Sequence, residues 1–342
     1  MRSRIVTTVA CCILFAVPAA ANFFATQSQK VLASDAATGA SFGGSNAIAV
    51  EGNTAIIGAP GAEAAYVFTF ANGTWTEQAI LTPSDAGGSF GESVAISGNT
   101  AMVGATGNQS DRGAVYVFDL AGISGPVTEY AIIRSSDGVG GDEFGYVALD
   151  GDTAIIGAPL DDDNGASSGS AYLFERVQGT WTEQAKLLAS DGLGNDQMGF
   201  DVAVSGDIAL VGIPRDGDNG SFSGTVRVFD LAGATGTINE SARLLASDGE
   251  EFDRLGNTVA LAGTTALIAA TGDDDGGSGA GAVYVYDVNG ISGSVTEDDK
   301  LVASDATASD FFGGAISIWN DLALIGAETA DGMVGSAGAA YL

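Results

Sequence analysis

The chain repeats one pattern six times at intervals of roughly 50 residues, and this repetition constrains the fold more than any other feature. Each copy begins with a large apolar residue followed by glycine. About a dozen residues later comes a run such as "IIGAP" or "LVGIP". The six starting points are Phe42-Gly43, Phe90-Gly91, Phe144-Gly145, Met198-Gly199, Leu255-Gly256 and Phe312-Gly313.

Every copy contains short apolar runs that alternate and are rich in β-branched residues, which predicts strands rather than helices. After the Gly-Ala-Pro run come "AYVF" or "VYVF" and then a fourth run that ends in a Ser-Asp pair, as in "AKLLASD". Pairs such as Gly52-Asn53 and Gly151-Asp152 separate the first two runs. Two-residue loops that begin with glycine favour tight antiparallel hairpins, so each copy predicts four antiparallel strands.

Repeats of this length with four strands each predict an all-β chain folded as a six-bladed β-propeller. An extra copy of the fourth run, "QKVLASD", precedes the first unit at Gln29–Asp35. We expect this segment to close the ring by pairing Lys30–Ala33 with Ala339–Leu342, because closure removes exposed sheet edges. A seven-bladed ring, of which this chain is a fragment, is the alternative.

The repeated residues resemble the FG-GAP repeat family, which is familiar from the propeller of integrin α-chains. The likeness is greatest to exported microbial FG-GAP proteins, whose pattern runs almost unbroken from Lys186 to Pro214. The resemblance implies a propeller that serves recognition, adhesion or display. In integrin-like members a calcium loop lies between the first two strands. This chain has only a tight turn there, so that site cannot be carried over.

Acidic residues gather instead after the Gly-Ala-Pro run of the third, fourth and fifth units. Clustered carboxylate and amide oxygens are the ligands that Ca²⁺ prefers, and a bound dication would relieve their mutual repulsion. The alternative is a set of solvated loops on an acid-rich surface. The candidate calcium ligands are Asp161, Asp162, Asp163 and Asn164, then Asp216, Asp218 and Asn219, and then Asp273, Asp274 and Asp275.

The N-terminus predicts export. Arg2 and Arg4 precede an apolar stretch, and small residues near Ala21 offer a cleavage site. We therefore predict a signal peptide at residues 1–21 and one propeller domain at residues 22–342, secreted or at the cell surface. Both cysteines, Cys11 and Cys12, lie in the signal peptide, and no other stretch predicts a transmembrane segment.

Charge and residue content narrow the function. The chain has 43 acidic and 12 basic residues, a formal net charge of −31, which disfavours binding to nucleic acid. It has no histidine, so histidine-dependent catalysis is excluded. We expect a non-catalytic module that binds a protein or glycan. The alternatives are a propeller enzyme that uses carboxylates, as a lyase or hydrolase, and a structural display domain of a larger surface protein.

Overall fold

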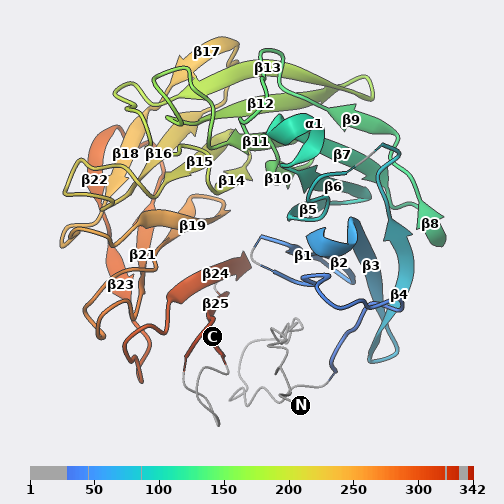
Figure 1. Ribbon diagram of the computed structural model, residues 1–342. Helices are drawn as coiled ribbons and strands as arrows, with labels where there is room; N and C mark the ends of the chain where they lie inside the picture. Colours follow the sequence, from blue (N-terminus) through green and yellow to red (C-terminus); the bar gives the residue numbers. More distant parts are fainter. Residues whose placement is uncertain (1–28, 45, 86, 320–321, 331–337) are drawn as a thin grey trace.

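The computed structural model describes residues 29–44, 46–85, 87–319, 322–330 and 338–342 and arranges their strands as six sheets around a common axis (Figure 1). The predicted six-bladed propeller is confirmed. The predicted signal peptide, residues 1–21, lies outside the described residues. No helix in the described part of the chain is long and apolar enough to span a membrane.

The first three blades follow one another in sequence. Blade one consists of β1 (Ile48–Glu51), β2 (Thr54–Ala59), β3 (Ala64–Ala71), β4 (Thr74–Leu81) and β8 (Gly125–Val127). Blade two consists of β5 (Ser93–Ser97), β6 (Thr100–Ala105), β7 (Ala114–Asp119) and β9 (Ala131–Ile133). Blade three consists of β10 (Tyr146–Asp150), β11 (Thr153–Ala158), β12 (Ser170–Val177), β13 (Thr180–Leu188) and β17 (Gly236–Asn239).

The other three blades complete the ring. Blade four consists of β14 (Val202–Ser205), β15 (Ile208–Ile213), β16 (Thr225–Asp230), β18 (Ala242–Leu245) and β22 (Gly293–Thr296). Blade five consists of β19 (Leu255–Ala262), β20 (Thr265–Ala270), β21 (Ala282–Asp287) and β23 (Asp299–Leu301). Blade six consists of β24 (Phe312–Trp319), β25 (Leu322–Ala327) and β26 (Ala339–Tyr341). Two single-turn helices, η1 (Pro60–Ala62) and α1 (Asn108–Asp111), lie in loops.

The prediction of four strands per blade holds only for blades two and five. In blades one, three and four a fifth strand pairs in parallel with the fourth. These added strands are β8, β17 and β22, and each comes from the repeat that builds the next blade. The first two strands of each fully described hairpin are joined as predicted, for example with Glu51 opposite Thr54 and Gly52 at φ +55°.

The apolar cores lie between blades. We call each contact between neighbouring blades a junction and name it by its two blades. Phe144, which begins the third repeat, is fully buried in a cluster with Met102 and Val117 of blade two, and its ring meets Tyr172 edge-on at 5.4 Å. The repeated Phe-Gly element therefore packs one blade against the next, as an aromatic pair at a buried site.

The glycine of the Gly-Ala-Pro run has a different role from the strand-end turn that its sequence suggests. A Cβ on Gly157 would lie 2.0 Å from the carbonyl oxygen of Gly199 in the next blade. Gly58 and Gly104 make the same approach to Gly91 and Gly145, with 1.9 Å in each case. Glycine is required at these junctions because two backbones touch there; junction 5/6 has Ala269 at the corresponding position.

Junction 6/1 differs from the other five. The cluster on this face of blade one contains Val31, Ala33, Ala40 and Phe42 from the N-terminal side but no residue of blade six. Lys30–Ala33 form no strand, and β26 pairs only with β25 among the described residues. The expected pairing of Lys30–Ala33 with Ala339–Leu342 is not formed in this structure, and ring closure through it stays a prediction.

Candidate functional site

The predicted metal ligands lie in the loops between the second and third strands of blades three, four and five. In each loop the first acidic residue is buried and the next ones are exposed. The buried residues are Asp161, Asp216 and Asp273, which are 4%, 4% and 3% exposed. Each of them contacts the third strand of its own blade, and Asp161 and Asp273 also contact a lysine on the fourth strand.

In blade three the convergence point is Lys186, on β13. Its Nζ lies 2.8 Å from Asp137, 3.0 Å from Asp161 and 2.6 Å from Asp163. Tyr172 of β12 donates its hydroxyl to the same Asp137 and Asp161. Asp137 belongs to the Ser-Asp pair of the preceding repeat, so the ammonium group joins two blades as well as two loops.

Blade five repeats this arrangement with Lys300. Its Nζ lies 2.8 Å from Asp248, 2.8 Å from Asp273 and 2.7 Å from Asp275, while Tyr284 donates to Asp248 and Asp273. The oxygens of these three aspartates lie within 4.8 Å of one another, close enough to share one cation. That cation is the lysine of the protein itself.

Blade four uses two arginines. Arg227 replaces the tyrosine of β16, is 1% exposed, and donates to Asp191 and Asp216 at 2.9 and 2.8 Å. Arg243 of β18 pairs with Asp191 and Asp218. Arg215, which directly precedes Asp216 in the sequence, does not neutralise this loop: its guanidinium lies over the ring of Phe222 at 5.9 Å and forms no ion pair among the described residues.

The remaining polar groups of these loops mostly form hydrogen bonds within the same loop. The first aspartate of each accepts the backbone N–H two residues later, and Asp162 and Asp274 each accept one five residues later, at 2.7 Å. The backbone N–H groups of Asn164 and Asn219 donate to serine hydroxyls, and the side-chain amide of Asn164 donates to the carbonyl of Ala189 at 3.0 Å. The predicted ligands of one loop therefore share a neighbourhood, while the three loops remain separate sites.

These clusters do not fit a calcium ion in addition to their own cations. No dication is needed to relieve the repulsion between the aspartates, because an ammonium or guanidinium already lies among the carboxylates that would bind the metal. Loss of hydration alone would lower the pKa of Lys186, yet its hydrogen bonds to Asp137 and Asp163 raise it above its ordinary value. The structure does not test the sequence-based prediction of calcium binding at these loops, and the basic side chains argue against it in the wild type.

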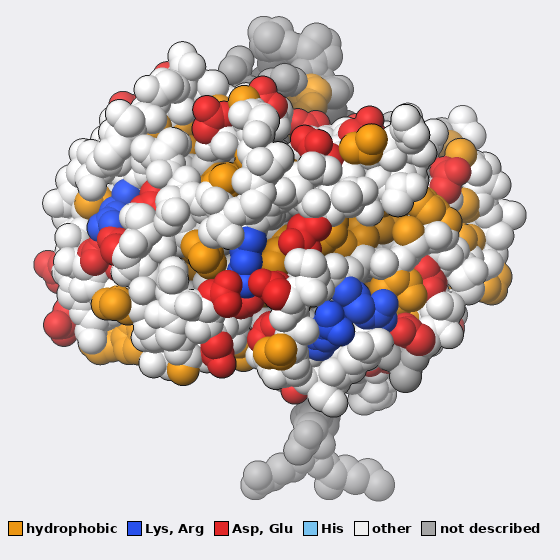
Figure 2. Space-filling view, turned by 90° about the horizontal axis from the view of Figure 1, so that it is seen from above, with side chains coloured by type: hydrophobic (Ala, Val, Ile, Leu, Met, Phe, Trp, Pro, Cys, Tyr) orange, Lys and Arg blue, Asp and Glu red, His pale blue; other side chains and the backbone are white. Residues whose placement is uncertain are grey.

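Sequence reasoning missed the basic residues because they lie on strands, far along the chain from the loops. The available signal was positional: Lys186, Arg243 and Lys300 all stand four residues before the serine of the Ser-Asp pair. Figure 2 shows the result on one face of the molecule, where isolated basic side chains lie among acidic ones.

Asp201 is the acid with the most perturbed titration near the axis. Loss of hydration raises its pKa to about 7, although backbone N–H groups of Val259 and Val202 oppose the shift. Its carboxylate accepts a hydrogen bond of 2.8 Å from the backbone N–H of Val259, which lies on β19, the inner strand of the next blade. Ser93 accepts the N–H of Val147 in the same way at junction 2/3. This equivalence assigns Asp201 a structural role in joining blades.

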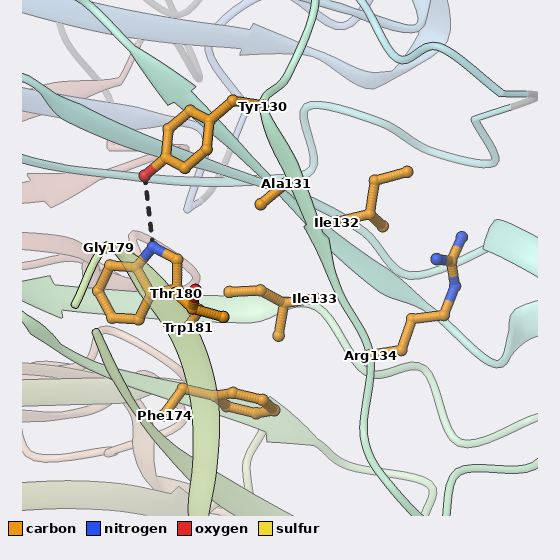
Figure 3. Close-up of a pocket in the computed structure, with 9 residues that line it drawn as sticks. All are labelled: Tyr130, Ala131, Ile132, Ile133, Arg134, Phe174, Gly179, Thr180 and Trp181. Carbon is orange, nitrogen blue, oxygen red and sulfur yellow. Dashed lines mark hydrogen bonds between the residues drawn. The ribbon is translucent and has the colours of Figure 1, made fainter. Parts of the chain in front are cut away.

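A pocket of about 420 Å³ lies on the outer rim between blades two and three, and we call it the rim pocket (Figure 3). Trp181 and Phe174 of blade three face Ile133 of β9 across it, and Arg134, the residue after β9, also lines it. The indole N–H of Trp181 points to the hydroxyl of Tyr130 at 3.4 Å. Trp181 is only 9% exposed, so it covers the outer strands rather than forming an open stacking platform.

Comparison with protein families matches the FG-GAP repeat over most of the chain, in six copies that each contain one of the repeat starting points described above. The chain belongs to the FG-GAP repeat family. The six FG-GAP repeats span residues 25–68, 75–118, 127–174, 181–229, 238–286 and 295–342. A comparison with curated proteins finds no match. The family is therefore established by the repeats and by the propeller that they form.

Proposed function

We propose that this FG-GAP protein is an exported, non-catalytic recognition or adhesion module whose partner is a protein or a glycan. The observation that supports this most strongly is the contrast between repeated contacts at the junctions and a variable outer rim. The same contacts hold the blades together at successive junctions, whereas the outer rim differs from blade to blade in strand number and in the rim pocket. A rigid repeated scaffold with locally different rims suits binding.

The non-catalytic assignment rests on the residues that remain for chemistry. The chain has no histidine, and its two cysteines lie in the predicted signal peptide. The buried carboxylates of the three acidic loops, those of Asp161, Asp216 and Asp273, are engaged with lysine, arginine and tyrosine. Asp201, whose raised pKa would suit a general acid, accepts backbone N–H groups at a junction instead.

Export is part of the proposal because the N-terminal sequence has the pattern of a signal peptide. FG-GAP repeats are typical of extracellular proteins, which agrees with it. Expression of the full chain in a secreting host, followed by N-terminal sequencing of the secreted product, tests this directly. A product that keeps residues 1–21 and stays with the cells would contradict export by cleavage.

The binding proposal is tested by immobilising the mature chain and screening extracellular proteins and a glycan array by surface plasmon resonance. We expect saturable binding that survives physiological salt, because a specific contact does not depend on the net charge of −31 alone. In parallel, the chain is assayed on ester, phosphate and polysaccharide substrates. Reproducible turnover that a single carboxylate-to-amide substitution abolishes would favour the lyase or hydrolase alternative.

A further inference from the structure

The rim pocket lies where three other blades receive their fifth strand. In blades one, three and four an alanine of the fourth strand stands opposite a glycine of the added strand: Ala79 opposite Gly125, Ala185 opposite Gly236 and Ala242 opposite Gly293. Each of these alanines precedes the serine of the Ser-Asp pair by the same interval, and so does Ala131 of β9. Blade two therefore has the strand edge that accepts a fifth strand.

No described strand pairs with this edge of β9. In the third repeat the segment that corresponds to the added strands belongs to β13 and pairs within blade three. Gly179-Thr180-Trp181 stands before Glu183 as Gly125-Pro126-Val127 stands before Glu129. In the third repeat, however, Thr180 and Trp181 pair with Val177 and Arg176 of their own blade. The rim pocket is the space that this choice leaves between β9 and β13.

The first repeat shows what the walls of the rim pocket can bind. Its twin segment also reads "GTWTEQA", and Trp75 stands where Trp181 does. The side-chain carboxamide of Gln29 accepts from the backbone N–H of Trp75 at 2.7 Å and donates to its carbonyl at 2.8 Å. Gln29 occupies the position of Ala131. Trp181 has the same strand register, so its N–H and C=O face β9 with no glutamine between them.

We propose that the rim pocket binds an extended peptide, which adds to β9 as a parallel fifth strand. A peptide backbone supplies the donor and acceptor that Gln29 supplies in the first repeat, and it satisfies the free edge of β9 as well. This inference rests on the proposed recognition function and names the site and the class of partner for it.

The internal strands define the sequence that fits. A glycine stands opposite the alanine, and two positions later an apolar residue packs into the inter-blade core, as Val127, Ile238 and Val295 do. In the rim pocket that apolar side chain would meet Phe174, Trp181 and Ile133. The expected partner is therefore an extended segment of the form Gly-x-Val/Ile followed by a polar residue.

The experiment uses the mature chain and a labelled peptide with the sequence of residues 290–297, "GISGSVTE", measured by fluorescence anisotropy. The matched variant is Ala131→Gln, which places in blade two the glutamine that the first repeat has at Gln29. We expect this variant to melt no lower than the wild type and to bind the peptide at least about tenfold more weakly. A peptide methylated on the backbone nitrogens should also fail to bind.

A second measurement does not depend on that variant. Trp75→Phe with Trp319→Phe leaves Trp181 as the single tryptophan, and its emission should shift as the peptide saturates the site.

Equal binding by Ala131→Gln, equal binding of the methylated peptide, or displacement by free sugars would overturn the peptide site. Binding of another partner that Ala131→Gln leaves unchanged would overturn this site while the recognition function stands. If the screens find no partner but the peptide binds as described, the proposed function fails and this site survives.

Discussion

Junction 2/3 and junction 6/1 are built from the same kinds of parts, yet only the first is complete. At junction 2/3, Phe144 is fully buried between two blades, and Lys186 joins Asp137 of one repeat to Asp161 of the next. At junction 6/1, Tyr66 donates to Asp35 and Ser34 donates to Glu77, which are the contacts made on the side of blade one. The contacts to blade six are missing from the described residues.

The comparison teaches that the segment before the first repeat already lies as a fourth strand should. The same serine-to-glutamate contact recurs from Ser136 to Glu183 and from Ser190 to Glu240. Lys30 stands at the position of Lys186, and Asp305, which accepts from Tyr341, stands at that of Asp137. Closing the ring would therefore add the fourth strand of blade six and, with it, a Lys30–Asp305 ion pair at junction 5/6.

The largest effect is expected from removing the aromatic residue of a complete junction. Phe144→Ala should lower the free energy of unfolding by about 3–5 kcal/mol, because the site is buried on both sides. Phe42→Ala, its counterpart at junction 6/1, should cost about half as much because Phe42 is only partly buried. Urea unfolding of both variants measures the difference. Equal losses would mean that junction 6/1 is as well packed as the others in solution.

The next effect concerns closure. Deleting residues 22–35 should lower the stability by about 2–3 kcal/mol, since Val31 and Ala33 and the contacts of Ser34 and Asp35 are lost. Val31→Cys with Ala340→Cys, placed by analogy with the third and fourth strands of blade five, should form an internal disulfide on oxidation. An unchanged melting curve together with an absent crosslink would show that the segment is a tail.

A third prediction compares the cations inside the junctions. Lys300→Met leaves Asp248, Asp273 and Asp275 without their ammonium group, so it should cost about 2 kcal/mol. Calcium should then restore about 1 kcal/mol or more in this variant, with dissociation constants around 10⁻⁴–10⁻³ M. In the wild type, calcium and sodium chloride of equal ionic strength should give equal shifts in Tm.

Two controls separate the metal from the charge. Lys300→Arg should keep the wild-type behaviour, and Lys300→Met combined with Asp273→Asn and Asp275→Asn should lose the response to calcium. A calcium-specific shift in the wild type that Asp162→Asn with Asp163→Asn reduces would instead support calcium ligands in the acidic loop of blade three.

The smallest effect is the pH dependence from Asp201 at junction 4/5. Its pKa of about 7 in the folded state exceeds the ordinary value of 3.8, so the folded protein keeps a proton that the unfolded chain loses. Stability should therefore fall as the pH rises from about 4 to about 7. Asp201→Asn should remove this slope and be more stable than the wild type by about 1–2 kcal/mol at pH 8, with equal stability near pH 4. Melting curves from pH 4 to 8 decide, with Asp207→Asn as an exposed control.

The repeats were enough to predict the blades and the tight hairpins, because both depend on residues close together in the chain. The fifth strands could not be predicted in this way. Gly125–Val127 is a short stretch in a loop of the second repeat, and only the neighbouring edge of β4 makes it a strand. The acidic loops were located from the sequence, but their basic partners were not, because Lys186 and Lys300 reach them from another strand.

The glycine contact has a further consequence. In the first four repeats the glycine of the Gly-Ala-Pro run approaches the glycine of the next repeat's Phe-Gly element, as Gly157 approaches Gly199, so these contacts all face in one direction around the ring. The fifth repeat has Ala269 at this position. At the two ends, Gly326 would have its nearest contact with Ala315 of its own blade at 3.5 Å, and Gly43 likewise meets only side chains of blade one. Such head-to-tail surfaces can join two molecules as readily as the two ends of one. In dilute solution closure within one molecule is favoured over association of two molecules. The two ends of one chain meet at an effective concentration on the order of millimolar, which exceeds the concentration of separate chains. Closure of the ring therefore competes with polymerisation, and the protein concentration relative to this effective concentration sets the balance.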